Sequence, residues 1–229
     1  MPDSCLLLDI EGTTTAISFV YDVLFPYAKR AIPAFVTAHA ATSEVGQAMD
    51  LVLQDASDDE RRLPRTDAVI TVTRRQMAAD VKAPGLKTLQ GLVWRHGYES
   101  GEIKGHVYPD VPAAFAAWSG AKRPIAIYSS GSVLAQQLLF RHSIAGDLTP
   151  FISGHYDTTS GAKQSPASYL TICSAWGRPP GSVTFCTDVL KEAEAARTAG
   201  LNAVLLMRPG NPPLPAGLPV AVHGDFSRM

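Results

Sequence analysis

Two acidic residues, Asp9 and Glu11, follow a short apolar segment, Cys5 to Leu8, near the start of the chain. This segment contains no polar residue, as expected for a parallel strand that is buried on both faces. Carboxylates at the end of such a strand are costly unless they are paired or coordinate a metal. One carboxylate can attack phosphorus as a nucleophile, and another can transfer protons during the same reaction. The pair therefore favours a chemical role over a simple Asp-Gly turn.

Polar groups suited to phosphoryl transfer recur at three later places in the chain. Ser129 and Ser130 follow one apolar segment, Asp188 follows another, and Lys163 lies just before a predicted helix. Hydroxyl and ammonium groups bind phosphate oxygens, whereas Mg²⁺ takes one or two carboxylates, which suits Asp9 and Asp188. Ligands of open α/β sheets bind at the carboxyl ends of the strands. These residues are therefore predicted to form one site.

Each of these residues also has a structural interpretation. The serines of 129–132 can form a polar turn and a helix cap, Lys163 can be a solvated surface residue, and Asp188 can cap the next helix. All of these interpretations would have to hold together at successive strand ends, which favours the single site. Glu192, one helical turn after Asp188, is expected to have only a supporting role. The histidines at 106 and 155 follow glycines and are expected in loops near the site.

The elements that must position this site alternate along the chain. Four buried strands are predicted, at 5–8, 125–128, 183–185 and 203–207. Helices are predicted between them, at 133–140, 166–176 with Ser165 as the cap, and 189–199 before Gly200. Strands that alternate with helices of this length predict an α/β fold, a Rossmann-like parallel sheet with helices on both faces.

The segment from residue 18 to residue 105 does not follow this alternation. It contains helical patterns over 20–40 and 67–81 and few strand signals, and Pro26 and Pro33 are expected to kink or break the first helix. We predict that this segment is a small helical cap domain inserted after the first strand. The predicted divisions are a catalytic core of 1–17 and 106–229, a cap of 18–105, and a return hinge over 101–112.

The overall composition excludes several classes of function. The 20 basic and 21 acidic residues are scattered, which gives no footprint for nucleic acid or an anionic membrane. The chain shows no membrane-spanning apolar run and no signal-peptide pattern. Cys5, Cys173 and Cys186 are odd in number and lack metal-type spacing, which argues against disulfides and zinc. We expect a reduced cytoplasmic protein without nucleic-acid or membrane partners, and a monomer.

Together, the motifs resemble those of the haloacid dehalogenase-like hydrolases. The matching positions are the string Asp9 to Thr13, Ser129, Lys163 and Asp188, and the helical insertion matches the cap that follows the first motif in that superfamily. Glu11 departs from the second aspartate that is common in its phosphatases. Longer strings resemble the enolase-phosphatase (acireductone synthase) family: 9–15, 22–28, 105–112, 128–132 and 206–211. The resemblance covers nearly the whole chain, except the last dozen or so residues and parts of the insertion.

This resemblance implies a haloacid dehalogenase-like core and two steps on one small phosphorylated diketone. Enolisation of 2,3-diketo-5-methylthiopentyl-1-phosphate precedes its dephosphorylation to an acireductone, in methionine salvage, with one Mg²⁺ per subunit. The implied roles are nucleophile and magnesium ligand for Asp9, acid/base and backbone magnesium ligand for Glu11, phosphate binding for Ser129 and Ser130, substrate binding for Lys163, and magnesium binding for Asp188.

Other functions remain as alternatives. The nearest is a generic magnesium-dependent phosphomonoesterase of the same fold that acts on sugar phosphates or nucleotides. A catalytically silent phosphate-binding module is disfavoured because every core role has a residue. Dehalogenation is disfavoured because that chemistry needs no metal and gives Asp188 no role. The sequence does not identify the base for enolisation or the residues that contact the methylthio group; aromatic residues such as Phe19, Phe25, Tyr27 and Trp94 are candidates, although helical spacing is more typical of core residues.

Overall fold

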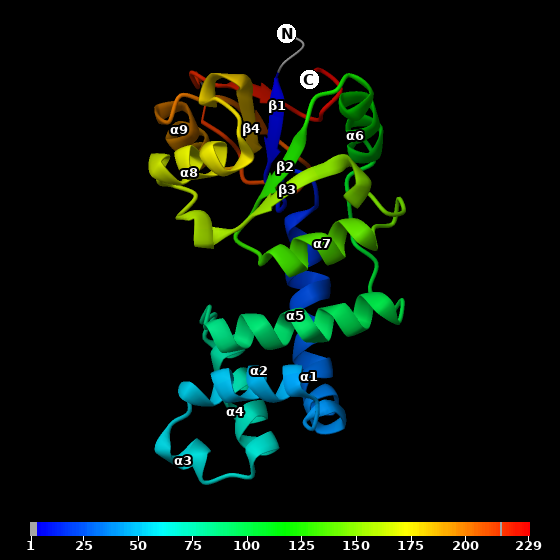
Figure 1. Cartoon of the computed structure of the whole chain (residues 1–229), viewed down its shortest axis with the longest axis vertical. Helices are drawn as coiled ribbons and strands as arrows, with labels where there is room; N and C mark the ends of the chain where they lie inside the picture. The colour runs from blue at the N-terminus through cyan, green and yellow to red at the C-terminus, as the bar shows by residue number, and fades with distance from the viewer. Residues whose placement is uncertain (1–3, 216) are drawn as a thin grey trace. The chain divides into compact units, whose positions relative to one another are not determined.

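The computed structural model describes residues 4–215 and 217–229 and divides into two compact units (Figure 1). One unit comprises the described residues up to 20 and from 104 onward, and the other comprises residues 21–103. The first contains the β-sheet and the second is helical. The cap function predicted for the inserted segment stays a prediction.

A parallel sheet forms the centre of the first unit. Its six strands are ordered β3-β2-β1-β4-β5-β6, and all neighbouring pairs are parallel. Their bounds are Cys5–Leu8 (β1), Ile125–Tyr128 (β2), Ile152–Tyr156 (β3), Val183–Thr187 (β4), Asn202–Leu206 (β5) and Ala221–His223 (β6). The strand order reverses between β1 and β4, where sheets of this order bind their ligands. Leu8 at the end of β1 pairs with Ile127 on one side and Cys186 on the other.

Four α-helices cover the two faces of this sheet (Figure 1). Their bounds are Val111–Gly120 (α6), Val133–Arg141 (α7), Pro166–Trp176 (α8) and Leu190–Thr198 (α9). On one face, α8 and α9 form a buried core with side chains such as Leu7 and Phe185. On the other face, α6 and α7 meet through the rings of Phe115 and Phe140, whose centroids lie 5.9 Å apart. Both faces are therefore buried, which explains the unbroken apolar strands.

The second unit is built from helices alone. A π-helix, Phe19–Leu24 (η1), leads into it, and its α-helices are Phe25–His39 (α1), Ser43–Gln54 (α2), Asp58–Arg61 (α3), Arg65–Ala78 (α4) and Pro84–Glu99 (α5). Pro26 lies in the first turn of α1, where proline is tolerated, and α1 continues through Pro33. Of the expected kink or break, a break at Pro33 is therefore wrong. A Cβ atom on Gly85 would lie 2.5 Å from the Val52 backbone nitrogen, so a glycine is needed where α5 approaches α2.

The fold class predicted from the sequence is confirmed, with differences at the sheet edges. Strands β1 and β2 have the predicted bounds, whereas β4 is longer and β5 is shifted by one residue. Strands β3 and β6 were not predicted, because β3 is only partly buried and β6 has three residues. His155 lies in β3 and not in a loop. The predicted hinge overlaps the first turn of α6, which begins at Val111.

The described residues also bear on the compositional predictions. Cys5, Cys173 and Cys186 are all buried, and none of them forms a disulfide within the described residues. No helix among the described residues is long and apolar enough to cross a membrane.

Candidate active site

Asp9 directly follows β1 and is only 2 % exposed. Its backbone N–H donates to the Cys186 carbonyl at 2.9 Å, which continues the pairing of β1 with β4. Its two carboxylate oxygens have different partners. Oδ1 accepts a hydrogen bond from the Ile10 N–H at 2.7 Å, and Oδ2 accepts one from the Thr187 hydroxyl at 3.0 Å. The strand end thus holds this carboxylate in one orientation.

Lys163 pairs with the carboxylate of Asp9. Its ammonium nitrogen lies 2.6 Å from Asp9 Oδ2 and 2.7 Å from Glu192 Oε2. The Thr187 hydroxyl lies 3.0 Å from both of those oxygens, so its single hydrogen can serve only one carboxylate at a time. The ammonium group has hydrogens for both. Lys163 is therefore the group that joins the two acids. Glu192, which was expected to have only a supporting role, directly contacts the lysine that pairs with Asp9.

Three hydroxyl groups fix the loop that carries Lys163. Tyr128 donates to the carbonyl of Gly161 at 2.9 Å, Ser168 to that of Ala162 at 2.7 Å, and Tyr169 to that of Lys163 at 2.6 Å. Each of the three donors comes from β2 or α8. Successive carbonyls of the loop are thus tied to the packed core, which holds the Lys163 backbone in place. Nothing in the sequence pattern pointed to this arrangement.

Glu11 and Ser129 come together from the ends of β1 and β2. The Ser129 hydroxyl donates to Glu11 Oε2 at 3.1 Å and accepts from the Gly131 N–H at 3.1 Å. Ser132 caps α7 by accepting from the Ala135 N–H at 3.3 Å. The predicted serine cap is therefore Ser132, while Ser129 faces the acid. Ser130 is exposed.

Asp188 approaches the first loop at Gly12. A Cβ atom on Gly12 would overlap the Asp188 carboxylate, and the φ angle of Gly12 is +70°, so both the space and the backbone require glycine. The N–H of Val189 donates to the Thr187 hydroxyl at 3.2 Å, and Asp188 does not serve as the N-cap of α9. The end of β4 thus directs the Asp188 carboxylate toward the loop that carries Asp9 and Glu11.

Burial and mutual repulsion shift the titration of these acids. Burial, reinforced by the Asp9 carboxylate, raises the pKa of Asp188 to about 6 and that of Glu192 to about 7. The same causes raise the pKa of Glu11. Burial lowers the pKa of Lys163, because it disfavours the charged form. The nearby Asp9 and Glu192 carboxylates have a larger opposite effect, so the pKa of the lysine is raised overall. Four carboxyl groups thus lie within electrostatic range of one ammonium group, which pairs directly with Asp9 and Glu192, and this excess of acids favours an additional cation.

The donor set fits a hard cation that keeps part of its hydration shell. Among the residues that the structure describes, no group of three or more His, Cys, Asp or Glu side chains is arranged as a metal centre. Mg²⁺ requires only one or two carboxylates and completes its shell with waters and phosphate oxygens. Asp9 and Asp188 supply two carboxylates. Two polar atoms, Thr13 Oγ1 on the first loop and Asn211 Oδ1 beside Gly12, are buried without a hydrogen-bond partner among the described residues. Oxygen donors of this kind suit Mg²⁺.

A second layer of residues holds the first loop; the sequence placed His106 in a loop near the site but gave no role to Arg208 or Asp110. Arg208 is 4 % exposed, donates from Nε to the Thr13 carbonyl at 2.9 Å, and makes two bonds to Asp110 at 2.8 and 3.0 Å. His106 Nδ1 accepts from the Ala16 N–H at 3.1 Å. His106, Asp110 and Arg208 lie within the strings 105–112 and 206–211, which resemble those of a known family. That resemblance was the sequence signal that could have identified them.

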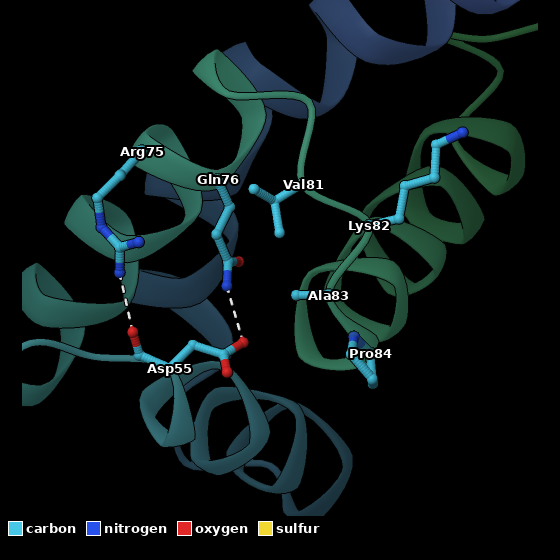
Figure 2. Close-up of a pocket in the computed structure, with 7 residues that line it drawn as sticks. All are labelled: Asp55, Arg75, Gln76, Val81, Lys82, Ala83 and Pro84. Carbon is cyan, nitrogen blue, oxygen red and sulfur yellow. Dashed lines mark hydrogen bonds between the residues drawn. The ribbon is translucent and has the colours of Figure 1, made fainter.

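The helical unit contains a cavity of its own, of about 440 Å³ (Figure 2). Figure 2 shows Asp55 between Arg75, which donates to its carbonyl at 2.9 Å, and Gln76, which donates to its carboxylate at 2.9 Å. The other lining residues are Val81, Lys82, Ala83 and Pro84. None of the predicted site residues lines this cavity.

The chain is similar to known proteins along most of its length. Residues 4–200 match the model of the haloacid dehalogenase-like hydrolases. The chain is 48 % identical to enolase-phosphatase E1 of Azotobacter vinelandii over 210 residues, covering 92 % of this chain and 91 % of that protein. It is 50 % identical to enolase-phosphatase E1 of Drosophila mojavensis over 219 residues, covering 92 % and 88 %.

Solved structures show the same architecture. The crystal structure of the Saccharomyces cerevisiae UTR4 protein matches with a TM-score of 0.85 and 36 % identity, and 99 % of each chain is covered. CbbY from Rhodobacter sphaeroides, in complex with phosphate, matches with a TM-score of 0.58 at 17 % identity, covering 98 % of this chain and 95 % of that one. The second likeness shows the fold alone.

Proposed function

Since the chain belongs to the haloacid dehalogenase-like hydrolases and, among them, to the enolase-phosphatase family, we propose a role for each residue at the carboxyl ends of β1, β2 and β4. The chain is an enolase-phosphatase of methionine salvage and acts on a small phosphorylated substrate. It converts 2,3-diketo-5-methylthiopentyl-1-phosphate to the enol phosphate and then to the acireductone and phosphate. The main support for these roles is one observation: the buried Asp9 carboxylate pairs with Lys163 at the end of β1, next to the point between β1 and β4 where the strand order reverses.

In the phosphatase step, Asp9 is the nucleophile. One of its oxygens attacks phosphorus, and the bond between phosphorus and the substrate oxygen breaks, which leaves an aspartyl-phosphate. Glu11 gives its proton to the departing oxygen. Glu11 then takes a proton from the water that attacks the aspartyl-phosphate, which releases inorganic phosphate and restores Asp9. The raised pKa of Glu11 supports this role, since a carboxyl group that donates a proton near neutral pH must retain it until then.

Three other side chains bind the negatively charged oxygens of the phosphoryl group. Lys163 stays positively charged and lies beside the nucleophile, so it can stabilise the charge on the transferring oxygens. The hydroxyl groups of Ser129 and Ser130 bind phosphate oxygens. Ser129 also contacts Glu11, which places the phosphate site and the proton donor side by side. Substrate binding and proton transfer thus depend on two neighbouring strand ends, those of β1 and β2.

The enzyme is a metal-dependent hydrolase, and we propose that the metal is one Mg²⁺ per subunit. Asp9, Asp188 and the backbone carbonyl of Glu11 would hold it. When bound, the ion offsets the repulsion between carboxylate and phosphate and stabilises the transferring group. The crowding of carboxyl groups around Lys163 supports a site for a cation of this charge.

For the enolase step, we propose that Glu11 also takes the proton from the carbon that bears the phosphate. The electron pair of that C–H bond forms the C=C bond, and the neighbouring carbonyl oxygen takes a proton from water. Glutamate is one methylene longer than the aspartate common at this position in related phosphatases, so its carboxyl group reaches a different point. The variant Glu11→Asp tests this proposal when the two steps are followed separately. Enolisation is expected to fall more than phosphate release, and retained enolisation, or equal loss of both steps, would contradict the dual role.

One assay tests the whole proposal. The purified protein is mixed with the diketo phosphate, with and without Mg²⁺, and both the transient enol absorbance and the release of phosphate are followed. We expect both signals, in that order and only with the metal, and a covalent phosphate that disappears in Asp9→Asn. Common sugar phosphates and nucleotides serve as controls. Faster turnover of these than of the diketo phosphate would favour the generic phosphomonoesterase instead.

The remaining predictions from the sequence stay proposals. We propose that residues 18–105 act as a cap, that the enzyme functions as a monomer, and that it acts in the cytoplasm without nucleic-acid or membrane partners. Size-exclusion chromatography with light scattering tests the monomer directly.

A further inference from the structure

The side chain of Asn211 ties the loop after β1 to the end of β5. Its amide nitrogen, Nδ2, donates to the carbonyl of Gly12 at 2.8 Å and to the carbonyl of Leu206 at 3.2 Å. Carbonyl oxygens only accept hydrogen bonds, so the nitrogen of the amide must face both of them. The orientation of this amide is therefore determined by its partners.

This orientation leaves the amide oxygen of Asn211 without a partner. Oδ1 is buried and accepts no hydrogen bond in the described part of the chain. A buried acceptor that is left unpaired costs about 1–3 kcal/mol, so such atoms are rare without a reason. Anchoring the loop requires only Nδ2. The unpaired Oδ1 therefore calls for a second explanation.

Oδ1 of Asn211 lies on the same side of Gly12 as the Asp188 carboxylate. A Cβ atom on Gly12 would lie 3.1 Å from Asn211 Oδ1 and would overlap Asp188 Oδ2. Two hydrogen-bond acceptors thus face the same region, and one of them, Oδ1 of Asn211, receives no donor from the described residues. Water can donate to both, because it carries two hydrogens. A water molecule in the hydration shell of a cation is a particularly good donor.

We propose that Asn211 is a positioning residue of the magnesium site, whose Oδ1 accepts a hydrogen bond from a water in the hydration shell of the ion. This inference rests on the proposed function, in which Asp188 is a magnesium ligand. Mg²⁺ gives up its waters reluctantly, so partners for these waters contribute to its binding. Asn211 also fixes Gly12, which lies next to Glu11 and opposite Asp188. The residue therefore links loop geometry to metal affinity.

The test measures the binding of Mg²⁺ alone, without substrate, by isothermal titration calorimetry. Asn211→Ala is expected to raise the Kd at least about ten-fold, the usual effect of losing an outer-shell partner. Asn202→Ala is the matched control, because Asn202 also donates to a carbonyl, that of Gly181, but at the exposed start of β5. This control should leave the Kd within about two-fold. An equally small change in Asn211→Ala would overturn the proposal, whatever its melting temperature.

A second variant separates the role of Oδ1 as a hydrogen-bond acceptor from the role of Nδ2 in anchoring the loop. Asn211→Asp keeps an acceptor oxygen but cannot donate to the carbonyls of Gly12 and Leu206. Under the proposal, its affinity for Mg²⁺ recovers relative to Asn211→Ala, although both variants lose the anchor and melt at a lower temperature than the wild type. If Asn211→Asp binds the ion no better than Asn211→Ala, the side chain acts only as an anchor and the proposal is wrong.

The same titrations distinguish this proposal from the function on which it rests. A wild-type protein that binds Mg²⁺ but does not turn over the diketo phosphate contradicts the substrate assignment, while the Asn211 result stands. A wild-type protein that binds no Mg²⁺ at millimolar concentration contradicts both the magnesium proposal and the role of Asn211.

Discussion

The ammonium nitrogen of Lys163 lies 2.6 Å from Oδ2 of Asp9, and both side chains are at most 10 % exposed. An ion pair removed from water in this way is only weakly screened by solvent and salt. Its value for stability is small, because desolvation offsets the attraction. The pairing is instead useful for chemistry, since it places a positive charge beside the proposed nucleophile, where phosphoryl oxygens would bind.

Removal of this positive charge should impair phosphate release. We expect Lys163→Met to lower kcat/KM by about 10²–10³-fold, the range found when one preorganised charge-stabilising group is lost. Steady-state phosphate release measures the effect. Lys191→Met, at an exposed position next to Glu192, is the control and should remain close to the wild type. A loss of less than ten-fold in Lys163→Met would place Lys163 outside the phosphate site.

Glu192 should matter less than Lys163 but more than a surface acid. In Glu192→Gln the amide oxygen can still accept from Lys163, while the negative charge 2.7 Å from the ammonium group is lost. We expect kcat to fall about ten-fold with little change in KM, because Asp9 still orients the lysine. Glu194→Gln, exposed on the same helix, is the control. Activity equal to that of the control would show that Glu192 has no part in positioning Lys163.

Arg208 is predicted to be important for stability. Its guanidinium group is 4.5 Å from the ring centroid of Tyr108 and 4.8 Å from that of Phe226, and it pairs with both oxygens of Asp110. Lysine cannot reproduce this planar, two-bond geometry. We expect Arg208→Lys to lower the free energy of unfolding by about 2–4 kcal/mol, as measured in urea. Arg178→Lys, at an exposed position, should change it by less than about 0.5 kcal/mol.

In the helical unit, Glu60 should make stability depend on pH. Its hydrogen bonds to Arg75 and to the Ser57 N–H lower its pKa from 4.5 to about 2. Because the folded value lies below the unfolded one, the stabilisation is complete above about pH 4.5 and is lost as the pH falls toward 2. We expect Glu60→Gln to lower the free energy of unfolding by about 1–2 kcal/mol at pH 7. The effect is no larger because half of the Arg75 side chain is exposed, so that water screens the interaction.

The measurement for Glu60 is urea unfolding between pH 3 and pH 7, with wild type and variant compared at each pH. The difference between them should shrink as the pH is lowered. Asp59→Asn is the control, because Asp59 pairs with Arg62 while 90 % of its side chain is exposed. A difference that stays constant with pH would show that Glu60 acts through packing and not through its charge.

The buried centre of the sheet was predictable from the sequence because burial leaves a direct mark on composition. β1 and β2 contain only apolar residues and tyrosine, and their predicted bounds hold. β3 was missed because it mixes Ser, Gly and His with apolar residues at a sheet edge, where no periodicity is imposed. Pro33 was expected to kink or break its helix. The helix does not end there, since packing of the surrounding helical unit can outweigh a local penalty.

The site was predictable only as a set of residue types at strand ends. The distances that join Lys163 to both Asp9 and Glu192 depend on how α8 and α9 pack, and no local pattern encodes that packing. The same applies to Asn211, whose partner Gly12 is 199 positions away in the chain. Long-range hydrogen bonds of this kind leave no periodic signature in a single sequence.

The position of β1 in the middle of the sheet has a consequence for folding during synthesis. Its neighbours are β2, which begins at Ile125, and β4, which ends at Thr187, so β1 cannot complete its pairing until most of the chain has been made. Residues 21–103 make their contacts within one continuous segment and can fold earlier. The strand that precedes Asp9 thus leaves the ribosome before both of its partners, β2 and β4, and is paired only after they have been made. Newly made chains should therefore acquire phosphatase activity only after the helical unit has become resistant to proteases.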